Sequence, residues 1–393
     1  MSRGRFTFFL ISAVLVLTLL TGSLLGTVRA DTPDGDDSLY KYLSVFTEVL
    51  SLIRQAYVDS PEIGDLMTGA LDGTTDALDP FSLYVPPGQV EGYVAAAESG
   101  ERLTGLTLLK ERGVAYVVAV TPGGPAAEAD LRLGDLVARI DGELTREMPL
   151  WEVQQGLGGE VGKQVRLEVI RQGETLEKTI ELGAFEASGI AFEEADGLPV
   201  ARLSALDAAS VEALRSYLRE LESDRLLLDL RRSSAGDPEV AFALADLFAE
   251  GDLGTLQERS EAVATFTSSG EPLWSGRLVL LVGRGTFGPG EILATVLRQK
   301  TDAELVGERT FGWAGERASA DLASGGRLFY TSAFYTGPDG EPLSSSLSPD
   351  TRVRRIDAGF GDGEVSMEEL IFRRGLERLK AEDEAEPLEQ QAA

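Results

Sequence analysis

Apolar residues fill an almost unbroken run at positions 8–28, preceded by Arg3 and Arg5 and followed by the small residue Ala30. A basic start, an apolar run and a small residue are the pattern of an export leader. The run is also about long enough to cross a bilayer, which takes roughly 20 helical residues. We therefore expect residues 1–30 to be a signal peptide cleaved after Ala30 or a membrane anchor at residues 8–28. The protein is expected to be exported, and to be periplasmic or anchored to the cytoplasmic membrane facing outward.

A helical pattern follows a polar linker and places residues 31–97 in an N-terminal helical region. Apolar residues recur there at intervals of three and four, the period of one helix face. They are Leu39, Leu43, Phe46, Val49, Leu50 and Ile53. Asp59, Ser60 and Pro61 end this helix, and a second short helical stretch ends near residues 78–82.

The pattern changes to short strands with turn residues between positions 98 and 183. Residues 114–120 and 165–170 are the clearest strands, because they are short, rich in Val and bounded by glycine or charged turns. This part of the chain is therefore expected to be a separate β-rich domain.

Strands and helices alternate from residue 184 to about 358, which predicts an α/β core domain with a largely parallel sheet. Strands are predicted at 198–203, 226–230 and 278–282, and helices at 208–221, 238–248 and 291–299. Sites in such sheets lie beyond the carboxyl ends of the strands, here after Leu230, Val282 and Val306. Residues 359–393 are expected to form a last helix at 367–379 and an acidic tail. The predicted fold class is thus multidomain α/β.

Composition excludes several kinds of chemistry. The chain has 65 acidic and 36 basic residues and a formal net charge of −29, so no nucleic-acid partner is expected. It has neither Cys nor His, which excludes disulfides, thiolate zinc sites and every mechanism with a histidine base. Asp339, Glu341 and Asp350 lack the spacing of metal ligands. We expect no cofactor and no metal site.

Residues 122–142 carry a Pro-Ala pair before a short helix, a Gly-Asp turn and a strand closing on Ile-Asp-Gly. This segment resembles the signature of a PDZ domain, with Asp130 where that family usually has Gly. A PDZ domain adds a chain end as a strand to its sheet edge and holds the terminal carboxylate on backbone N–H groups. The predicted peptide-binding loop comprises Leu103, Thr104, Gly105, Leu106 and Thr107. Its aliphatic side chains favour hydrophobic tails, and the alternative is a PDZ fold that acts only as a spacer.

Several further motifs follow one another in a characteristic order. They are Leu-Asp-Pro-Phe-Ser at 78–82, Asp-Leu-Arg at 229–231, Gly-Glu-Arg-Thr-Phe-Gly at 307–312 and Ser-Pro-Asp at 348–350. With the PDZ-like segment, they resemble the carboxyl-terminal processing (tail-specific) serine peptidases over residues 39–350. The resemblance implies a PDZ domain followed by a peptidase core of the crotonase-like type.

The resemblance also implies a Ser nucleophile with a Lys base, a pair that works when burial removes the lysine proton. This chain departs from that pattern at the positions that should carry it. Matching Glu291 and Ile292 to the family's nucleophile run places Gly288 at the nucleophile, and the Thr-Phe-Gly run places Trp313 at the base. The two positions are 25 apart, as in the family.

Two supporting positions of the family also differ. Arg317 stands where a polar Gln usually follows the base. Ala235 replaces one residue of a Gly-Gly pair, beside Gly236, in the region expected to supply oxyanion donors.

These replacements lead to the hypothesis of a pseudopeptidase in the cell envelope. It would bind C-terminal tails of other proteins and act as a regulator, an adaptor or a partner of an active peptidase. Two alternatives stay open. One is an active serine-type endopeptidase with non-standard residues, for which Thr286 and Lys300 are the nearby candidates, and the other is a structural subunit with a closed PDZ groove. The resemblance also implies a possible homo-oligomer surface on helices 39–53 and 367–379.

Overall fold

The structure is a computed structural model that describes residues 34–111, 113–186, 189–354 and 365–381. The predicted leader or anchor lies outside the described residues, as does the acidic tail from residue 382. Within the described ranges, no helix combines the length and the apolar character needed to cross a membrane. The chain divides into two compact units, residues 1–67 and 68–393.

The first unit contains α2 (Asp34–Ala56) and the beginning of α3 (Ile63–Asp76). Helix α2 covers the residues whose three- and four-residue spacing predicted it, and α3 is the predicted second helical stretch. Between them the chain bends at residues 57–59. Most of α3 belongs to the second unit, which also holds the candidate site.

An antiparallel sheet with the order β2-β3-β4-β6-β7 forms the β-rich domain of the second unit. Its strands are β2 (Leu106–Glu111), β3 (Val114–Val120), β4 (Leu136–Ile140), β6 (Gln164–Arg171) and β7 (Glu174–Glu181), with β5 (Glu143–Leu144) beside β4. Alternate residues of β6, namely Val165, Leu167 and Val169, point into its core. The helices α5 (Pro125–Glu128) and α6 (Leu150–Gly156) complete the domain. The strand β2 is an edge of this sheet.

The β-rich domain differs from our prediction at its start. Helix α4 (Val90–Thr104) runs through the expected boundary at residue 98. It ends at Gly105, whose φ of 65° suits glycine and whose N–H donates to the Glu101 carbonyl at 2.7 Å. Residues 98–104 are therefore helical, and Leu103 and Thr104 are not part of a loop.

A six-stranded sheet with the order β19-β16-β15-β11-β9-β8 forms the core domain. Its strands are β8 (Ile190–Ala195), β9 (Leu198–Leu203), β11 (Arg225–Asp229), β15 (Arg277–Val282), β16 (Glu304–Gly307) and β19 (Thr351–Arg352). All neighbouring strands are parallel except β8 and β9, which confirms the predicted architecture.

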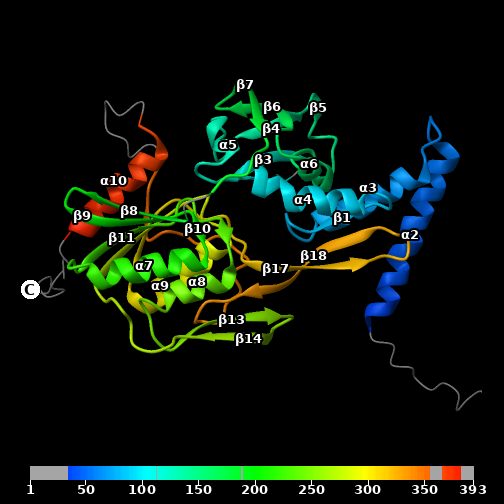
Figure 1. The fold of residues 1–393 in the computed structure, drawn as a ribbon. Coiled ribbons are helices and arrows are strands. Elements are labelled where there is room, and N and C mark those ends of the chain that lie inside the picture. The colour runs from blue at the N-terminus through cyan, green and yellow to red at the C-terminus, as the bar shows by residue number, and fades with distance from the viewer. Residues whose placement is uncertain (1–33, 112, 187–188, 355–364, 382–393) are drawn as a thin grey trace, which may run out of the picture. The chain divides into compact units, whose positions relative to one another are not determined.

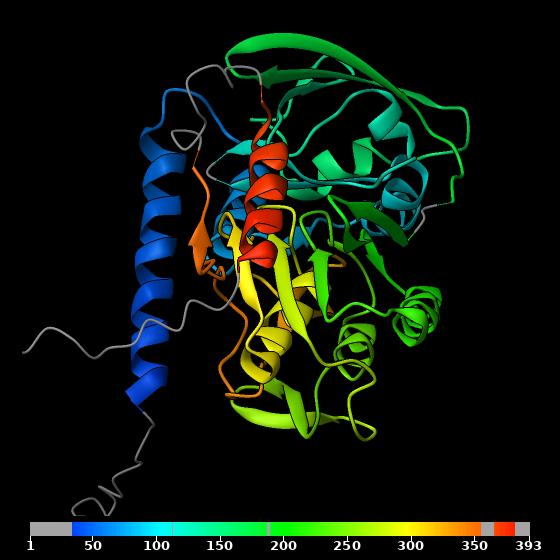
Figure 2. The same cartoon turned by 90° about the vertical axis from the view of Figure 1, so that its left-hand side faces the viewer.

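Both faces of this sheet are covered, as a strand buried on both sides requires. Figure 1 shows α7 (Ala208–Glu220), α8 (Pro238–Ala245) and α9 (Pro289–Thr301) on one face. Leu226 and Leu228 of β11 pack toward these helices, whereas Leu227 packs toward α10 (Met367–Lys380) on the other face. Figure 2 looks onto the face that α10 covers. Helix α8 ends at Ala245, three residues before the predicted end.

The structure contains an antiparallel sheet that the hydrophobic pattern did not predict. It has the order β1-β18-β13-β14, with β17 paired to β18. Its strands are β1 (Leu83–Val85), β13 (Asp252–Glu258), β14 (Glu261–Thr267), β17 (Gly315–Asp321) and β18 (Arg327–Tyr335). Most residues of β18 are half-buried, so no clear alternation marks the strand in the sequence. Two short strands, β10 (Ala205–Leu206) and β12 (Ala235–Gly236), form a separate parallel pair. In the chain, β10 follows β9 and β12 follows β11.

Candidate functional site

Segments that follow the parallel strands β11, β15 and β16 form the candidate site. Ser234 follows β11, Gly288 follows β15 and Trp313 follows β16. Because the carboxyl ends of parallel strands lie at one edge of a sheet, these segments meet there. The predicted position of the site, beyond Leu230, Val282 and Val306, agrees with this arrangement.

Main-chain hydrogen bonds join these segments directly. The Phe287 N–H donates to the Ser233 carbonyl at 3.0 Å, and the Phe311 N–H donates to the Thr286 carbonyl at 3.2 Å. The Gly288 N–H donates to the Trp313 carbonyl at 3.1 Å. Gly288 and Trp313, which are 25 positions apart in the sequence, are therefore neighbours joined by a hydrogen bond in the structure.

Gly288 is the N-cap residue directly before helix α9. Its φ of 51° and ψ of −111° lie in a region that residues with a side chain rarely adopt. A Cβ atom built on Gly288 would meet no atom within 4 Å. The position is thus open on its outer side, and it carries no group that could act as a nucleophile.

Aromatic side chains fill the space beside Gly288. The Trp313 ring stacks on Phe81 with centroids 4.1 Å apart and on Phe287 with centroids 5.7 Å apart. Phe311 contacts Phe287 edge-on at 5.2 Å. Phe81 belongs to the Leu-Asp-Pro-Phe-Ser motif, and its position is fixed because the Asp79 carboxylate accepts the Phe81 N–H at 2.8 Å. We call Phe81, Phe287, Phe311 and Trp313 the aromatic cluster.

The carboxylate of Glu291 holds the segment that carries Trp313. It accepts the Gly312 N–H at 2.6 Å, the Trp313 N–H at 2.9 Å and the hydroxyl of Thr310. The side chain lies in the first turn of α9 and is almost fully buried. Burial raises the pKa of Glu291 to about 7, and its hydrogen bonds oppose this rise. The sequence analysis used Glu291 only to align the nucleophile run. It did not predict that this carboxylate would hold the segment that carries Trp313.

Ala235 and Gly236 form the short strand β12, which pairs with β10. Gly236 has a φ of 117°, and a Cβ atom there would lie 2.1 Å from the Leu206 carbonyl oxygen, so glycine is required. Ala235 is not among the residues with positive φ. The pair therefore fits its strand, and it lies at the cavity described below.

The alternative catalytic residues occupy unsuitable places. Thr286 is fully buried, and its hydroxyl donates to the Leu230 carbonyl at 2.8 Å and accepts the Gly283 N–H at 3.0 Å. Lys300 lies in the last turn of α9, roughly 15 Å along the helix from its start at 1.5 Å per residue. In the described part of the chain no cluster of acidic residues could hold a metal ion.

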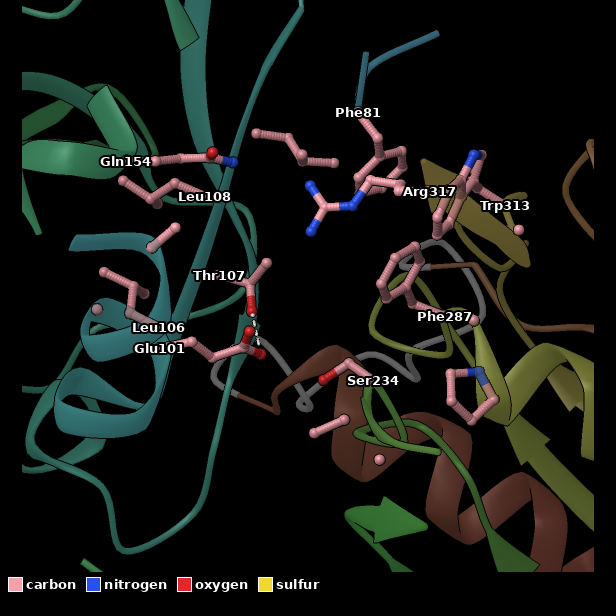
Figure 3. Close-up of a pocket in the computed structure, with 18 of the residues that line it drawn as sticks. Phe81, Glu101, Leu106, Thr107, Leu108, Gln154, Ser234, Phe287, Trp313 and Arg317 are labelled. Atoms are coloured by element: carbon pink, nitrogen blue, oxygen red, sulfur yellow. Dashed lines mark hydrogen bonds between the residues drawn. The ribbon is translucent and has the colours of Figure 1, made fainter. Parts of the chain in front are cut away.

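A cavity of about 510 Å³ joins the β-rich domain to the core domain within the second unit. One side is formed by Leu106, Thr107 and Leu108 of β2, and the other by residues that include Ser234, Gly288, Trp313 and Arg317. Figure 3 shows the three residues of β2 on one side of the cavity and Ser234, Trp313 and Arg317 on the other. An open sheet edge thus lies opposite Gly288 and Trp313, the positions predicted for the nucleophile and the base.

The predicted peptide-binding residues divide between this cavity and the domain core. Leu103 and Thr104 are buried in the β-rich domain on the last turn of α4, so the prediction that they form a binding loop is wrong. Leu106 and Thr107 line the cavity, and Gly105 connects the two pairs. Glu101, Tyr93 and Gln154 also line it and were missed, because no motif in the sequence marks them.

Comparison with known proteins gives matches for both domains of the second unit. Residues 199–353 match Peptidase family S41, and residues 116–171 match a PDZ domain. A carboxy-terminal-processing protease of Bartonella bacilliformis is 24% identical over 349 residues, which cover 86% of this chain and 80% of that protein. A carboxyl-terminal-processing protease of Synechocystis is 29% identical over 329 residues, which cover 79% of this chain and 77% of that protein.

A solved structure shows the same fold. The photosystem II D1 C-terminal processing protease superposes with a TM-score of 0.63 at 24% identity, over 77% of this chain and 86% of that chain. The resemblance stated from the motifs is confirmed by these matches. The chain carries a segment that matches Peptidase family S41 together with one that matches a PDZ domain, and it is similar to the carboxyl-terminal processing peptidases.

Proposed function

We propose that this protein is a catalytically inactive carboxyl-terminal processing peptidase homologue that binds the C-terminal tails of other proteins. The observation that carries the proposal is that Gly288 and Trp313, joined by a main-chain hydrogen bond, both line an open cavity. Gly288 has no hydroxyl and Trp313 has no basic nitrogen. The scaffold that would present a Ser-Lys pair is retained, and both reacting groups are absent from it.

Other residues of the cavity do not restore the chemistry. A serine mechanism without histidine needs a hydroxyl next to a base that is neutral near pH 7. Hydroxyl groups are available on Thr107 and Ser234, but no lysine is among the described residues that line the cavity. The carboxylates of Glu291, which is buried, and Glu316, which is half-buried, are both engaged in hydrogen bonds.

The open edge of β2 supports binding rather than a purely structural role. An extended tail could add to β2 by main-chain hydrogen bonds while its side chains enter the cavity. Because no cleavage would follow, the bound tail would stay intact. A protein that holds tails without cutting them suits a regulator or an adaptor of an active peptidase. We place it in the cell envelope on the basis of the leader.

The test compares the purified full chain with a Gly288→Ser, Trp313→Lys double variant on an unfolded protein substrate. We expect no cleavage by the parent, and cleavage by the variant if the register is right. Space for a serine exists at Gly288, although its φ makes the substitution strained by about 1–3 kcal/mol. The Gly288→Ser single variant is the matched control, since it has a hydroxyl without a base. Cleavage by the parent that survives Gly288→Ala would overturn the proposal.

A further inference from the structure

The start of β2 is where a PDZ domain ordinarily holds a terminal carboxylate, on free backbone N–H groups. In this protein, two of the N–H groups at that place already have partners. The Gly105 N–H donates to the Glu101 carbonyl at 2.7 Å, and the Leu106 N–H donates to the Thr104 hydroxyl oxygen at 3.1 Å. A carboxylate arriving there would have to displace these bonds.

An acidic side chain lies at the same end of the cavity. Glu101 lines it, and the Thr107 hydroxyl donates to the Glu101 carboxylate at 3.0 Å, as the dashed line in Figure 3 marks. Two carboxylates close together repel each other, although water reaches the exposed side chain of Glu101 and reduces this repulsion. The beginning of β2 is therefore unfavourable for the negative end of a peptide.

The opposite side of the cavity offers the complementary charge. Arg317 lies on β17, which pairs only with β18 and is a sheet edge. Figure 3 shows its guanidinium pointing from the side of Phe81 and Trp313 into the cavity, toward the side where Leu108 and Thr107 lie. Of the described residues that line the cavity, only Glu101, Glu316 and Arg317 carry charge at neutral pH.

Arg317 has no acidic partner within ion-pair distance among the residues that the structure describes. Its neighbour is the Tyr93 hydroxyl, which donates to the Gln154 side-chain oxygen at 3.0 Å. Burial raises the pKa of Tyr93 and the nearby Arg317 opposes that rise, so the phenol stays neutral at pH 7. Glu316 is engaged by the Tyr335 hydroxyl at 2.6 Å. By contrast, Arg327 on the neighbouring strand pairs with Asp321 at 2.7 Å.

We propose that Arg317 is the carboxylate-binding residue of this cavity, a role that rests on the proposed tail binding and replaces the backbone site at Gly105. A guanidinium presents paired N–H donors that match the two oxygens of a carboxylate. The ligand is a peptide that lies along β2 and places a carboxylate on Arg317. That carboxylate can be the free end of the tail or the side chain of an Asp or Glu within it.

The test measures the binding of labelled apolar peptides by fluorescence anisotropy at fixed ionic strength. Four peptides separate the two sources of carboxylate. Two carry an internal Glu and two carry a Gln at the same position, and in each pair one peptide has a free carboxyl end and the other an amidated end. We expect the peptide whose carboxylate binds Arg317 to bind about 10- to 100-fold more tightly than the peptide in which that carboxylate is replaced by an amide. A hydrogen bond to a charged group contributes about 1.5–3 kcal/mol, which corresponds to this ratio. If the parent protein binds the Glu peptides more tightly than the Gln peptides, the Glu is moved along the peptide to find the position that reaches Arg317.

Arg317→Gln should abolish this preference while leaving the neutral peptides bound. Arg327→Gln is the matched control, because Arg327 lies on the adjacent strand β18 and does not line the cavity. It should keep the preference, and circular dichroism should show both variants folded. A preference for the free carboxyl end that survives Arg317→Gln would return recognition to the loop at Gly105 and overturn the inference.

The remaining outcomes separate this inference from the proposed function. Equal binding of all four peptides to the parent would overturn the role of Arg317 and leave tail binding intact. Binding of none of them would overturn tail binding, and the role of Arg317 with it.

Discussion

Glu291 is the side chain on which the local arrangement of the site depends most. It is buried in the first turn of α9, yet its oxygens accept hydrogen bonds from Thr310, Gly312 and Trp313. A buried carboxylate is tolerated only when such donors satisfy it. The same contacts hold Trp313 next to Gly288, so one acidic residue sets the geometry of the two positions predicted for the base and the nucleophile.

The raised pKa of Glu291 predicts a specific dependence of stability on pH. Its pKa is about 7 in the folded protein against an ordinary value of 4.5, so between these values the folded state binds the proton more tightly. The free energy of unfolding should therefore fall as the pH rises from about 4.5 to 7, by about 3 kcal/mol from this group. Urea denaturation across this pH range measures the fall.

Glu291→Gln removes the titrating group and should flatten this part of the pH profile, although it lowers stability by losing an acceptor. Glu239→Gln is the matched control, because Glu239 is exposed in the first turn of α8. The difference between the parent and each variant isolates one residue from other titrating groups, such as Asp72, whose pKa burial raises to about 6. A Glu291→Gln profile with the parent's slope would contradict the assignment.

For single residues, the sequence predicted which residues lie at the site better than it predicted which side chains surround them. Gly288 and Trp313 were placed from two separate motifs, and the bond between the Gly288 N–H and the Trp313 carbonyl shows that they are neighbours. The partner of Trp313, Phe81, could not be predicted, because 232 positions separate them and no spacing rule links a loop before β1 to a loop after β16. Contacts of this kind depend on the tertiary fold.

At the scale of elements, the aromatic cluster connects the segment before β1 to the segments after β15 and β16. Phe81 and Trp313 stack with centroids 4.1 Å apart, and Phe287 stacks on Phe81 at 5.3 Å. Stacked pairs add about 0.5–1.5 kcal/mol beyond the area they bury. The cluster therefore fastens the segment between α3 and β1 to the core domain.

A double-mutant cycle with Phe81→Ala and Trp313→Ala tests this connection. Each single substitution should lower the free energy of unfolding by about 3 kcal/mol, and the two effects should fail to add by about 1 kcal/mol. Chemical denaturation gives all four values. The control cycle combines Phe81→Ala with Phe192→Ala, because Phe192 stacks on Tyr217 instead. Additivity in the first cycle would mean that the stacking contributes nothing measurable.

The pattern of the sequence predicted elements well where one face is clearly apolar. Helices α7, α9 and α10 and strands β3, β6, β11 and β15 appear within a few residues of their expected bounds. The sheet around β18 was missed because its residues are half-buried on both sides. The end of α4 was missed because Leu103 and Thr104 face a core that only the folded domain forms.

For the whole molecule, charge is the dominant global property. The formal net charge of −29 produces repulsion that favours the unfolded chain at low salt. Raising the ionic strength from about 10 to 150 mM shortens the screening length from about 30 to 8 Å. We expect the free energy of unfolding to rise by about 1 kcal/mol over this range, which corresponds to roughly 2 °C in the midpoint of thermal unfolding.

Calorimetry in NaCl measures this rise, and sorbitol at equal osmolality is the control for effects other than screening. A midpoint that falls with salt would mean that surface ion pairs, such as Arg202–Glu193 and Arg298–Asp350, outweigh the net repulsion. The charge itself was readable from the sequence. The leader at residues 1–30 and its role at the membrane stay predictions.

The backbone bonds among Ser233, Phe287, Thr286, Phe311, Gly288 and Trp313 have a consequence for how such a molecule can change over generations. These bonds use only N–H and carbonyl groups, which every residue except proline supplies. A lineage could therefore lose the hydroxyl and the amine one at a time without unravelling the framework that displayed them. Under the proposed function, selection for cutting would have ended while selection for holding a tail continued, and the descendant would keep the fold of its active ancestors.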